Sequence, residues 1–264
     1  MMPRRRSICV ITGSRAEYGL LSPVMRRIAA SQTLELQLIV TGAHLSATHG
    51  NTWRVIEDDG FKINERVHLN LSGDSGTELA MASGRGVSGF AEAFARLAPD
   101  LILILGDRYE ILAAAMAALL MRIPIAHIAG GDVTQGAFDD AIRHSLTKLS
   151  HLHFVTSESA AARVRQLGEE PHRIIVSGST GLDVIRQTAI LERAEVERRL
   201  GFPLRGQNLL ITFHPVTLGT IPGENQFVEL LAALDLVGAD TGFVFTAPNA
   251  DPGEAAIRSK LGNY

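Results

Sequence analysis

The chain has 264 residues, of which 46% are hydrophobic, and a formal net charge of −3 at pH 7. That length suits one large domain or two of ordinary size. The near-neutral charge argues against a general nucleic-acid binder, because neutralising phosphates needs clustered excess lysine and arginine. The single cysteine, Cys9, excludes a disulfide framework and a thiolate zinc cluster. No apolar stretch is long enough to cross a bilayer and no signal-peptide pattern opens the chain, so we expect a soluble, cytoplasmic protein with no membrane partner.

Short, continuously apolar runs recur at 8–12, 36–40, 101–105, 123–128, 152–156 and 173–177. Such runs are typical of parallel strands that are covered on both faces. Helical patterns lie between them at 78–98, 108–121, 139–150 and 158–167. Ser22-Pro23 is typical of an N-cap followed by proline at the first helical position, and predicts a helix from Pro23 to about Ala30. The alternation of strand and helix predicts an α/β fold with a doubly wound, Rossmann-like parallel sheet.

A domain boundary is expected near residue 190. The charged segment 190–200 predicts a solvated connecting helix, after which strand and helix patterns restart at 208–213, 225–237 and 242–247. We therefore predict an N-terminal Rossmann-like domain, residues 1–190, that carries a cluster of carboxylates. Residues 191–264 would form the connecting helix and a partial second Rossmann-like domain. Two strands with their helices make a poor independent domain, so we expect the sequence to be incomplete at its C-terminus.

Polar and ionisable side chains follow nearly every predicted strand, and ligands of open α/β sheets bind at those carboxyl ends. The loop after the first strand lacks the G-x-G-x-x-G spacing and the Walker lysine, which argues against nicotinamide cofactors and P-loop nucleotides. Its Arg15 can offer a planar fork to a diphosphate, or pair with Glu17 as a surface arginine. Later strands deliver His44, Asp107, Arg108, His127, Asp132 and His214.

Carboxylates are concentrated in the middle of the chain. Asp107 follows a strand and Gly106, where a carboxylate serves in catalysis or caps the next helix. Asp132, Asp139 and Asp140 come soon after a pair of glycines. Helical spacing pairs Asp139 with Arg143 and Asp140 with His144, which is either simple helix decoration or part of a site. Carboxylates near histidines suit the removal and delivery of protons.

Three histidines raise the alternative of a metal site. His151 and His153 point the same way if their segment is extended, and His127 lies on the neighbouring predicted strand. The chain contains no H-E-x-x-H motif and no facial-triad spacing. The sequence therefore predicts neither a metal nor a cofactor.

Seven segments, in this order and spanning almost the whole chain, resemble the UDP-N-acetylglucosamine 2-epimerases, in particular the hydrolysing branch that feeds sialic-acid-type sugar synthesis. They are GSRAEYGLLSPVM, TGAHLSATHGNT, ILGDRYEILAAAMAA, IPIAHIAGGDVTQGAFDDAIRHSLTKLSHLHFVTSE, GSTGLD, HPVT and PNAD. The resemblance implies a two-domain fold of the glycosyltransferase-B type, with the sugar nucleotide in the interdomain cleft and a homodimer or tetramer as the assembly. It also implies anti elimination of UDP across C1–C2 to give 2-acetamidoglucal, then syn addition of water. The products would be N-acetylmannosamine and UDP.

The resemblance also assigns roles to residues. Asp107 matches the aspartate of the family's GDR motif and Asp139 matches its later catalytic aspartate. Arg15 and His214 match positions that contact the nucleotide diphosphate. Residues on or beside other substrate-binding positions are His44, Arg108, His127, Arg143, His144 and Asn249.

The sequence departs from the family pattern in two places. Ala129 stands where some members carry a catalytic glutamate, and Asp132, three residues later, is the candidate for the second carboxylate. The chain also ends before the GNSS-like loop that binds uridine and phosphate in the family. We therefore expect turnover only from a longer form.

Two alternatives remain open. One keeps the chemistry and changes the substrate to UDP-N,N'-diacetylbacillosamine. The other is a truncated, non-catalytic sugar-nucleotide-binding remnant, against which the retention of Asp107, Asp139 and His214 argues.

Overall fold

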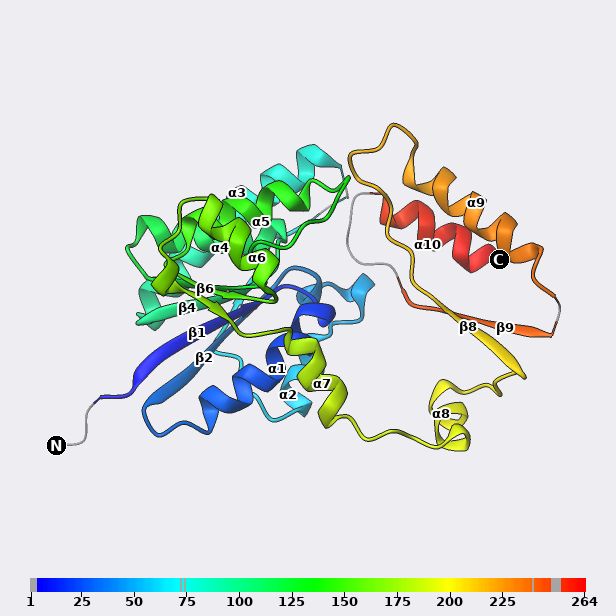
Figure 1. The fold of residues 1–264 in the computed structure, drawn as a ribbon, viewed down its shortest axis with the longest axis horizontal. Coiled ribbons are helices and arrows are strands. Elements are labelled where there is room, and N and C mark those ends of the chain that lie inside the picture. Colours follow the sequence, from blue (N-terminus) through cyan, green and yellow to red (C-terminus); the bar gives the residue numbers. More distant parts are fainter. Residues whose placement is uncertain (1–3, 72, 74, 239, 248–252) are drawn as a thin grey trace. The chain divides into compact units, whose positions relative to one another are not determined.

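The computed structural model describes residues 4–71, 73, 75–238, 240–247 and 253–264. The chain divides into two compact units, Met1–Arg186 and Gln187–Tyr264, each with its own parallel sheet (Figure 1). The sequence-based division into domains at residue 190 stays a prediction. Within the described part of the chain, no helix is both long and apolar enough to cross a membrane.

The first unit contains a seven-stranded sheet in the order β3-β2-β1-β4-β5-β6-β7, with every neighbouring pair parallel. The strands are β1 (Arg6–Thr12), β2 (Leu34–Thr41), β3 (Glu65–Val67), β4 (Leu101–Leu105), β5 (Ile125–Ile128), β6 (Leu152–Val155) and β7 (Ile174–Val176). The strand order reverses between β1 and β4, and ligands of such sheets bind at the carboxyl ends beside that reversal. The predicted doubly wound parallel α/β sheet is confirmed.

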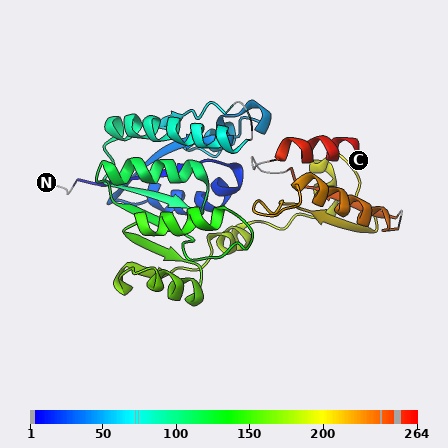
Figure 2. The same cartoon turned by 90° about the horizontal axis from the view of Figure 1, so that it is seen from above.

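Helices cover both faces of this sheet (Figure 1). One face carries α1 (Arg15–Ala29), α2 (Trp53–Asp58) and α7 (Thr180–Gln187). The other carries α3 (Gly76–Leu97), α4 (Tyr109–Leu120), α5 (Asp139–Leu149) and α6 (Glu158–Gln166), which Figure 2 shows in a row. Short 3-10 turns complete the unit at Gly42–Leu45, Ala47–His49 and Pro171–Arg173.

The core explains why the strands are continuously apolar. Successive strand residues point to opposite faces of a sheet. In β1, Cys9 and Ile11 therefore pack into the cluster that includes α3, α4 and α5, whereas Val10 packs with Leu21 and Met25 of α1. Both faces are buried, so both sets of residues are hydrophobic.

The first helix begins earlier than Ser22-Pro23 predicts, and that prediction is wrong. Ser14 is the N-cap of α1, and its Oγ accepts a hydrogen bond of 3.4 Å from the backbone N of Glu17. Pro23 lies inside the helix and cannot donate to the carbonyl of Gly19, four residues earlier. The Ser22 hydroxyl donates to that carbonyl instead, at 3.4 Å. The proline is thus accommodated within a helix that the β1–α1 loop starts.

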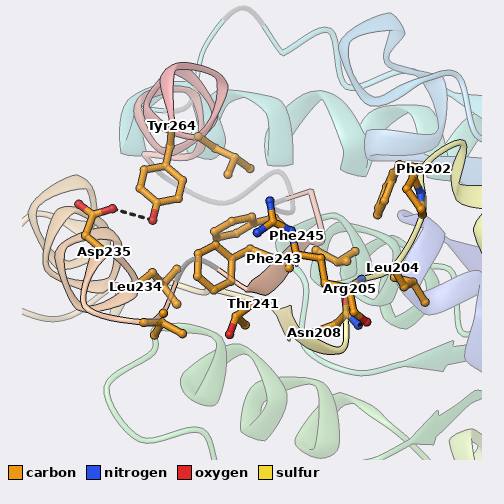
Figure 3. A pocket seen from close by; sticks show the side chains of 16 residues that line it. Phe202, Leu204, Arg205, Asn208, Leu234, Asp235, Thr241, Phe243, Phe245 and Tyr264 are labelled. Carbon is orange, nitrogen blue, oxygen red and sulfur yellow. Dashed lines mark hydrogen bonds between the residues drawn. The ribbon is translucent and has the colours of Figure 1, made fainter.

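The second unit contains a two-stranded parallel sheet and three helices in its described part. Its elements are α8 (Arg193–Leu200), β8 (Gln207–Ile211), α9 (Gly223–Asp235), β9 (Thr241–Phe245) and α10 (Glu254–Asn263). Aromatic contacts link Phe227 of α9 to Phe213 and to Phe245 of β9. A cavity of about 980 Å³ lies in this unit, and at its wall the Tyr264 hydroxyl donates to Asp235 (Figure 3).

Candidate active site

The site residues of the first unit gather where β1, β2, β4 and β5 end. Arg143 of α5 joins the segments after β4 and β5, and it is almost fully buried. Its Nη2 donates to Asp107, directly after β4, and at 2.9 Å to Oγ1 of Thr134. Its Nη1 donates at 3.1 Å to the backbone carbonyl of Asp132 and lies 3.5 Å from Oδ1 of Asp140. One guanidinium therefore connects the end of β4, the β5–α5 loop and α5.

Two further carboxylates belong to the same region. Asp139 is the first residue of α5, one helical turn before Arg143, and residues four apart lie on the same face of a helix. Asp132 accepts a hydrogen bond of 2.7 Å from the Thr156 hydroxyl, which follows β6. His144 also belongs here, because its Nε2 lies 3.5 Å from Oδ2 of Asp140. The structure thus brings Asp107 and the backbone of Asp132 to Arg143, and places Asp139 and His144 on the same helix as Arg143.

The backbone that carries Asp132 is tightly fixed. Gly131 has φ of +80°, and a Cβ there would lie 2.5 Å from the backbone oxygen of Ala160 in α6. Only glycine suits that close approach. The Gly131 carbonyl also accepts a hydrogen bond from Arg163. Gly131 is therefore explained by packing of the loop against α6, whereas a Cβ on Gly130 would lie 3.0 Å from Nδ1 of His127 and from Oγ1 of Thr147.

His127 contacts the backbone next to Asp107. Its side chain is fully buried in β5, and burial lowers its pKa to about 4, so the imidazole is neutral at pH 7. Its Nε2 lies 2.8 Å from the Gly106 carbonyl, which can only accept, so Nε2 carries the proton. Gly106 has φ of +78° and directly precedes Asp107. The imidazole therefore fixes the backbone that presents Asp107, and its predicted contact with substrate stays a prediction.

His44 ties together the loops after β1 and β2. Its Nε2 lies 3.0 Å from Oγ1 of Thr12 and its Nδ1 lies 2.8 Å from Oγ1 of Thr52. Burial, with a smaller effect of the Arg15 charge, lowers the pKa of His44 to about 4. The ring has no exposed surface. Its role in substrate binding likewise stays a prediction.

Arg15, predicted to contact the diphosphate, and Arg108, predicted to lie at another substrate-binding position, differ in environment. Arg15 is exposed at the start of α1, with its guanidinium carbon 5.7 Å from the centre of the Tyr18 ring. Arg108 precedes α4, and its side chain is only 12% exposed. The Arg108 Nε donates at 2.6 Å to Oε1 of Glu110, a residue with no exposed surface.

Sequence reasoning missed the buried carboxyl groups of Glu17 and Glu110. The backbone N of Gly13 donates to Oε2 of Glu17 at 2.9 Å, and burial, with the nearby Glu110 charge, raises the pKa of Glu17. Two signals were available. Ser14-Arg-Ala-Glu17 has the S-x-x-E spacing of a capping box, and Glu110 stands alone in an otherwise apolar helix.

The remaining predictions fall elsewhere. His214 is exposed after β8 in the second unit, and Asn249 lies outside the described residues. No predicted site residue lines the cavity of Figure 3. Among the residues described, no three His, Cys, Asp or Glu side chains are placed to hold a metal ion. His153, considered as a ligand, has its Nε2 3.1 Å from Oε2 of Glu169.

The family model described as UDP-N-acetylglucosamine 2-epimerase matches residues 26–264. The chain belongs to this family. It is 40% identical over 98% of its length to the GDP/UDP-N,N'-diacetylbacillosamine 2-epimerase (hydrolyzing) of Campylobacter jejuni, and covers 67% of that protein. It is 36% identical, again over 98% of its length, to the UDP-N,N'-diacetylbacillosamine 2-epimerase (hydrolyzing) of Legionella pneumophila, and covers 68% of it. The chain thus spans about two thirds of these relatives.

A solved structure shows the fold of the family. The UDP-GlcNAc 2-epimerase from Neisseria meningitidis, whose structure holds UDP-GlcNAc, superposes with a TM-score of 0.76 at 20% identity. The match covers 97% of this chain and 70% of that one. The predicted membership of the 2-epimerase family and its glycosyltransferase-B-type fold are confirmed.

Proposed function

We propose that this family member is a hydrolysing 2-epimerase that acts on a UDP-linked 2-acetamido sugar and releases UDP. The observation that carries the proposal is the contact of Asp107 with Arg143 at the carboxyl end of the sheet. Around this single cation lie the carboxylates of Asp107, after β4, and Asp140, of α5, beside the reversal of strand order where such sheets bind ligands.

The chemistry needs groups of this kind. A base removes the proton from C2 of the sugar, the C–H electrons form the C1–C2 double bond, and the C1–O bond to UDP breaks. Water then adds across the double bond, with its oxygen at C1 and a proton returned to C2, which gives the sugar with inverted C2. Proton removal and return are tasks of positioned carboxyl groups. We assign them to Asp107 and Asp139, with Asp132 as the further carboxyl group that guides water.

The diphosphate needs cationic partners. Arg15 is exposed at the end of β1, and Arg108 is held at the end of β4 by Glu110. Planar guanidinium groups match the geometry of phosphate oxygens. We propose that both arginines bind the departing UDP, together with His214 and Asn249 of the second unit. Arg143 and His144 orient the carboxylates, and His44 and His127 hold the loops that carry the site.

Two substrates merit a direct comparison. UDP-N-acetylglucosamine fits the family as a whole. UDP-N,N'-diacetylbacillosamine is the second candidate, because the two relatives at 40% and 36% identity carry that sugar in their names. Both sugars carry the acetamido group at C2 and the UDP at C1 that the chemistry requires.

The test uses the product of the complete reading frame. Each UDP-sugar is incubated with the enzyme in deuterated water, and UDP, the free sugar and deuterium at C2 are measured. We expect UDP and a C2-deuterated, inverted sugar from at least one substrate. Replacing a catalytic acid or base should cost roughly 100-fold or more in rate, so Asp107→Asn should lose turnover while its folding is retained. Asp58→Asn, an exposed carboxylate of α2, is the matched control and should retain the wild-type rate.

Other results would overturn the proposal. UDP binding without release of sugar would indicate a binding remnant. Wild-type turnover by Asp107→Asn would remove Asp107 from the chemistry. Assembly and location are part of the same proposal. We expect a cytoplasmic homodimer or homotetramer, and sedimentation of the purified protein would measure the number of subunits.

A further inference from the structure

Two buried glutamates that the chemistry above does not use lie near the β1–α1 loop, close to the candidate site. Glu17 is in the first turn of α1 and Glu110 is in the first turn of α4, and these helices follow β1 and β4 at the reversal of strand order. Glu17 is 6% exposed and Glu110 is 0% exposed. Each has one carboxyl oxygen, Oε1 of Glu17 and Oε2 of Glu110, that is buried without a hydrogen-bond partner among the described residues.

Both carboxyl groups lie against the β1–α1 loop. Gly13 donates its backbone N–H to Glu17, and a Cβ on Gly13 would come within 2.5 Å of Oε1 of Glu110. Gly42, after β2, is equally close, because a Cβ there would lie 2.9 Å from the same oxygen. The two glycines thus leave the space that the Glu110 side chain fills between three strand ends.

The charges balance only if the pair holds a proton. Arg108 is the cation in contact with it, through the 2.6 Å bond from Nε to Glu110. Two ionised carboxylates and one guanidinium would leave a net negative charge buried, which is costly. One proton makes the set of Glu17, Glu110 and Arg108 neutral. It also supplies a hydrogen-bond donor among carboxyl oxygens that have too few donors. Burial and the nearby like charge both favour that proton.

We propose that Glu17 and Glu110 are positioning residues: they share one proton, and the remaining carboxylate holds Arg108 in the orientation that binds the diphosphate. This inference rests on the function proposed above. Arg108 donates to Glu110, and Glu17 carries the proton. Burial, then the Glu110 charge, raise the pKa of Glu17 to about 8, against smaller opposing effects of Arg108, Gly13 and Ser14.

The groups around Glu17 are few. From α4 and the residue before it come Glu110 and Arg108. From the turn after β2 comes His44, which stays neutral and bonds to threonines. On α1 itself, Arg15 lies over Tyr18 at the exposed surface. A titration near neutral pH in this region can therefore be assigned to the glutamate pair.

The first test needs no substrate. The folded state holds the Glu17 proton to higher pH than the unfolded state, so between pH 4.5 and 8 the folded state binds more protons and stability falls as pH rises. From pH 6.5 to 8, the ratio of the wild-type unfolding constant to that of Glu17→Gln should rise up to about tenfold per pH unit, because Gln cannot ionise. Taking this ratio cancels the contribution of the histidines, which still bind protons in the unfolded state near pH 6.5. Glu35→Gln, which replaces an exposed glutamate of β2, should show the same pH dependence as the wild type.

The second test measures UDP affinity by calorimetry with the product of the complete reading frame. Wild-type affinity should fall above pH 8, whereas the affinity of Glu17→Gln should be independent of pH. Glu110→Gln should weaken binding about tenfold or more at pH 7, and Glu110→Asp, which keeps the carboxylate, should recover part of it. Glu35→Gln is again the control.

The outcomes separate the two proposals. If the wild type binds neither UDP nor a UDP-sugar, the proposed function fails. If it binds UDP and Glu110→Gln binds equally well, the positioning role is wrong. An equal pH dependence of stability in the wild type and in Glu17→Gln between pH 6.5 and 8 would show that the pair holds no proton. If Glu110→Gln does not fold, Glu17→Gln and the stability measurement still decide the question.

Discussion

The Arg143–Asp107 contact makes a quantitative prediction for Arg143→Met. The Arg143 side chain is 10% exposed and that of Asp107 is 22% exposed. Removing one partner of a buried ion pair costs about 3–5 kcal/mol, because the other charge is left without compensation. Water that reaches Asp107 reduces this penalty, so we take the lower end, about 3 kcal/mol. Such a loss is a large part of the stability of a domain, which is about 5–15 kcal/mol.

The assay is urea unfolding followed by tryptophan fluorescence. Trp53 is the single tryptophan of the chain and lies in α2, so its signal reports on the first unit. With a slope of about 2 kcal/mol per molar urea, a loss of 3 kcal/mol lowers the midpoint by about 1.5 M. Arg96→Met is the control: it breaks a two-bond pair with Glu65 on the surface, where Arg96 is 56% exposed, and should leave the midpoint unchanged.

A double-mutant cycle then isolates the pair. Asp107→Asn removes the charge that Arg143→Met leaves uncompensated, so the double variant should be more stable than the sum of the single losses predicts. Additive losses, or an Arg143→Met midpoint within the error of the wild type, would refute the arrangement of the site around this arginine.

Three further predictions concern other parts of the first unit. In urea unfolding, Gly131→Ala should lose about 1–3 kcal/mol more stability than Gly50→Ala. Both glycines have φ of +80°, but only at Gly131 would a new Cβ lie 2.5 Å from a backbone atom. Equal losses would contradict the packing on α6. Burial raises the pKa of the Cys9 thiol, so an aromatic disulfide reagent should label it only as the unit unfolds, and fast labelling in native buffer would argue against its place in the core. Burial lowers the pKa of His127 to about 4, so the unfolded state binds the extra proton and stability falls as the pH drops from 6.5 to 4. In this range the unfolding constant of the wild type should rise faster than that of His127→Gln, by up to about tenfold per pH unit. Equal slopes for the two proteins would count against a neutral imidazole.

The sheet could be predicted from the sequence because its strands are buried on both faces. Each strand of the first sheet except β3 follows from a continuous apolar run. β3 has three residues, Glu65-Arg66-Val67, of which two are charged, and it lies at the sheet edge. No hydrophobic pattern distinguishes such a strand from a loop. The start of α1 was missed for a different reason. Both Ser22-Pro23 and the pair Ser14 and Glu17 have the local pattern of a helix N-terminus, and the sequence alone does not decide between them.

The candidate site could be predicted only at the level of strand ends. The topology of parallel strands is enough to bring Asp107 and the β5–α5 loop to one edge. It does not determine that Arg143 points to Asp107 and not only to its helical neighbours Asp139 and Asp140. That choice depends on the tertiary packing of α5, which the sequence pattern does not contain. Nor could spacing tell that the imidazoles of His44 and His127 are buried and serve the loops.

The proposed role of the glutamate pair bears on the loop after β1, where many doubly wound proteins carry a glycine-rich phosphate loop. In those proteins, free backbone N–H groups at the first helix N-terminus bind the phosphate. Here the N–H of Gly13 donates to Glu17, and the N–H of Glu17 donates to the Ser14 hydroxyl. The N–H groups of Gly13 and Glu17 at the start of α1 are therefore taken by side chains of the protein itself. We expect an anionic substrate at this edge to use side-chain charges as well, and Glu110 holds Arg108 in place there.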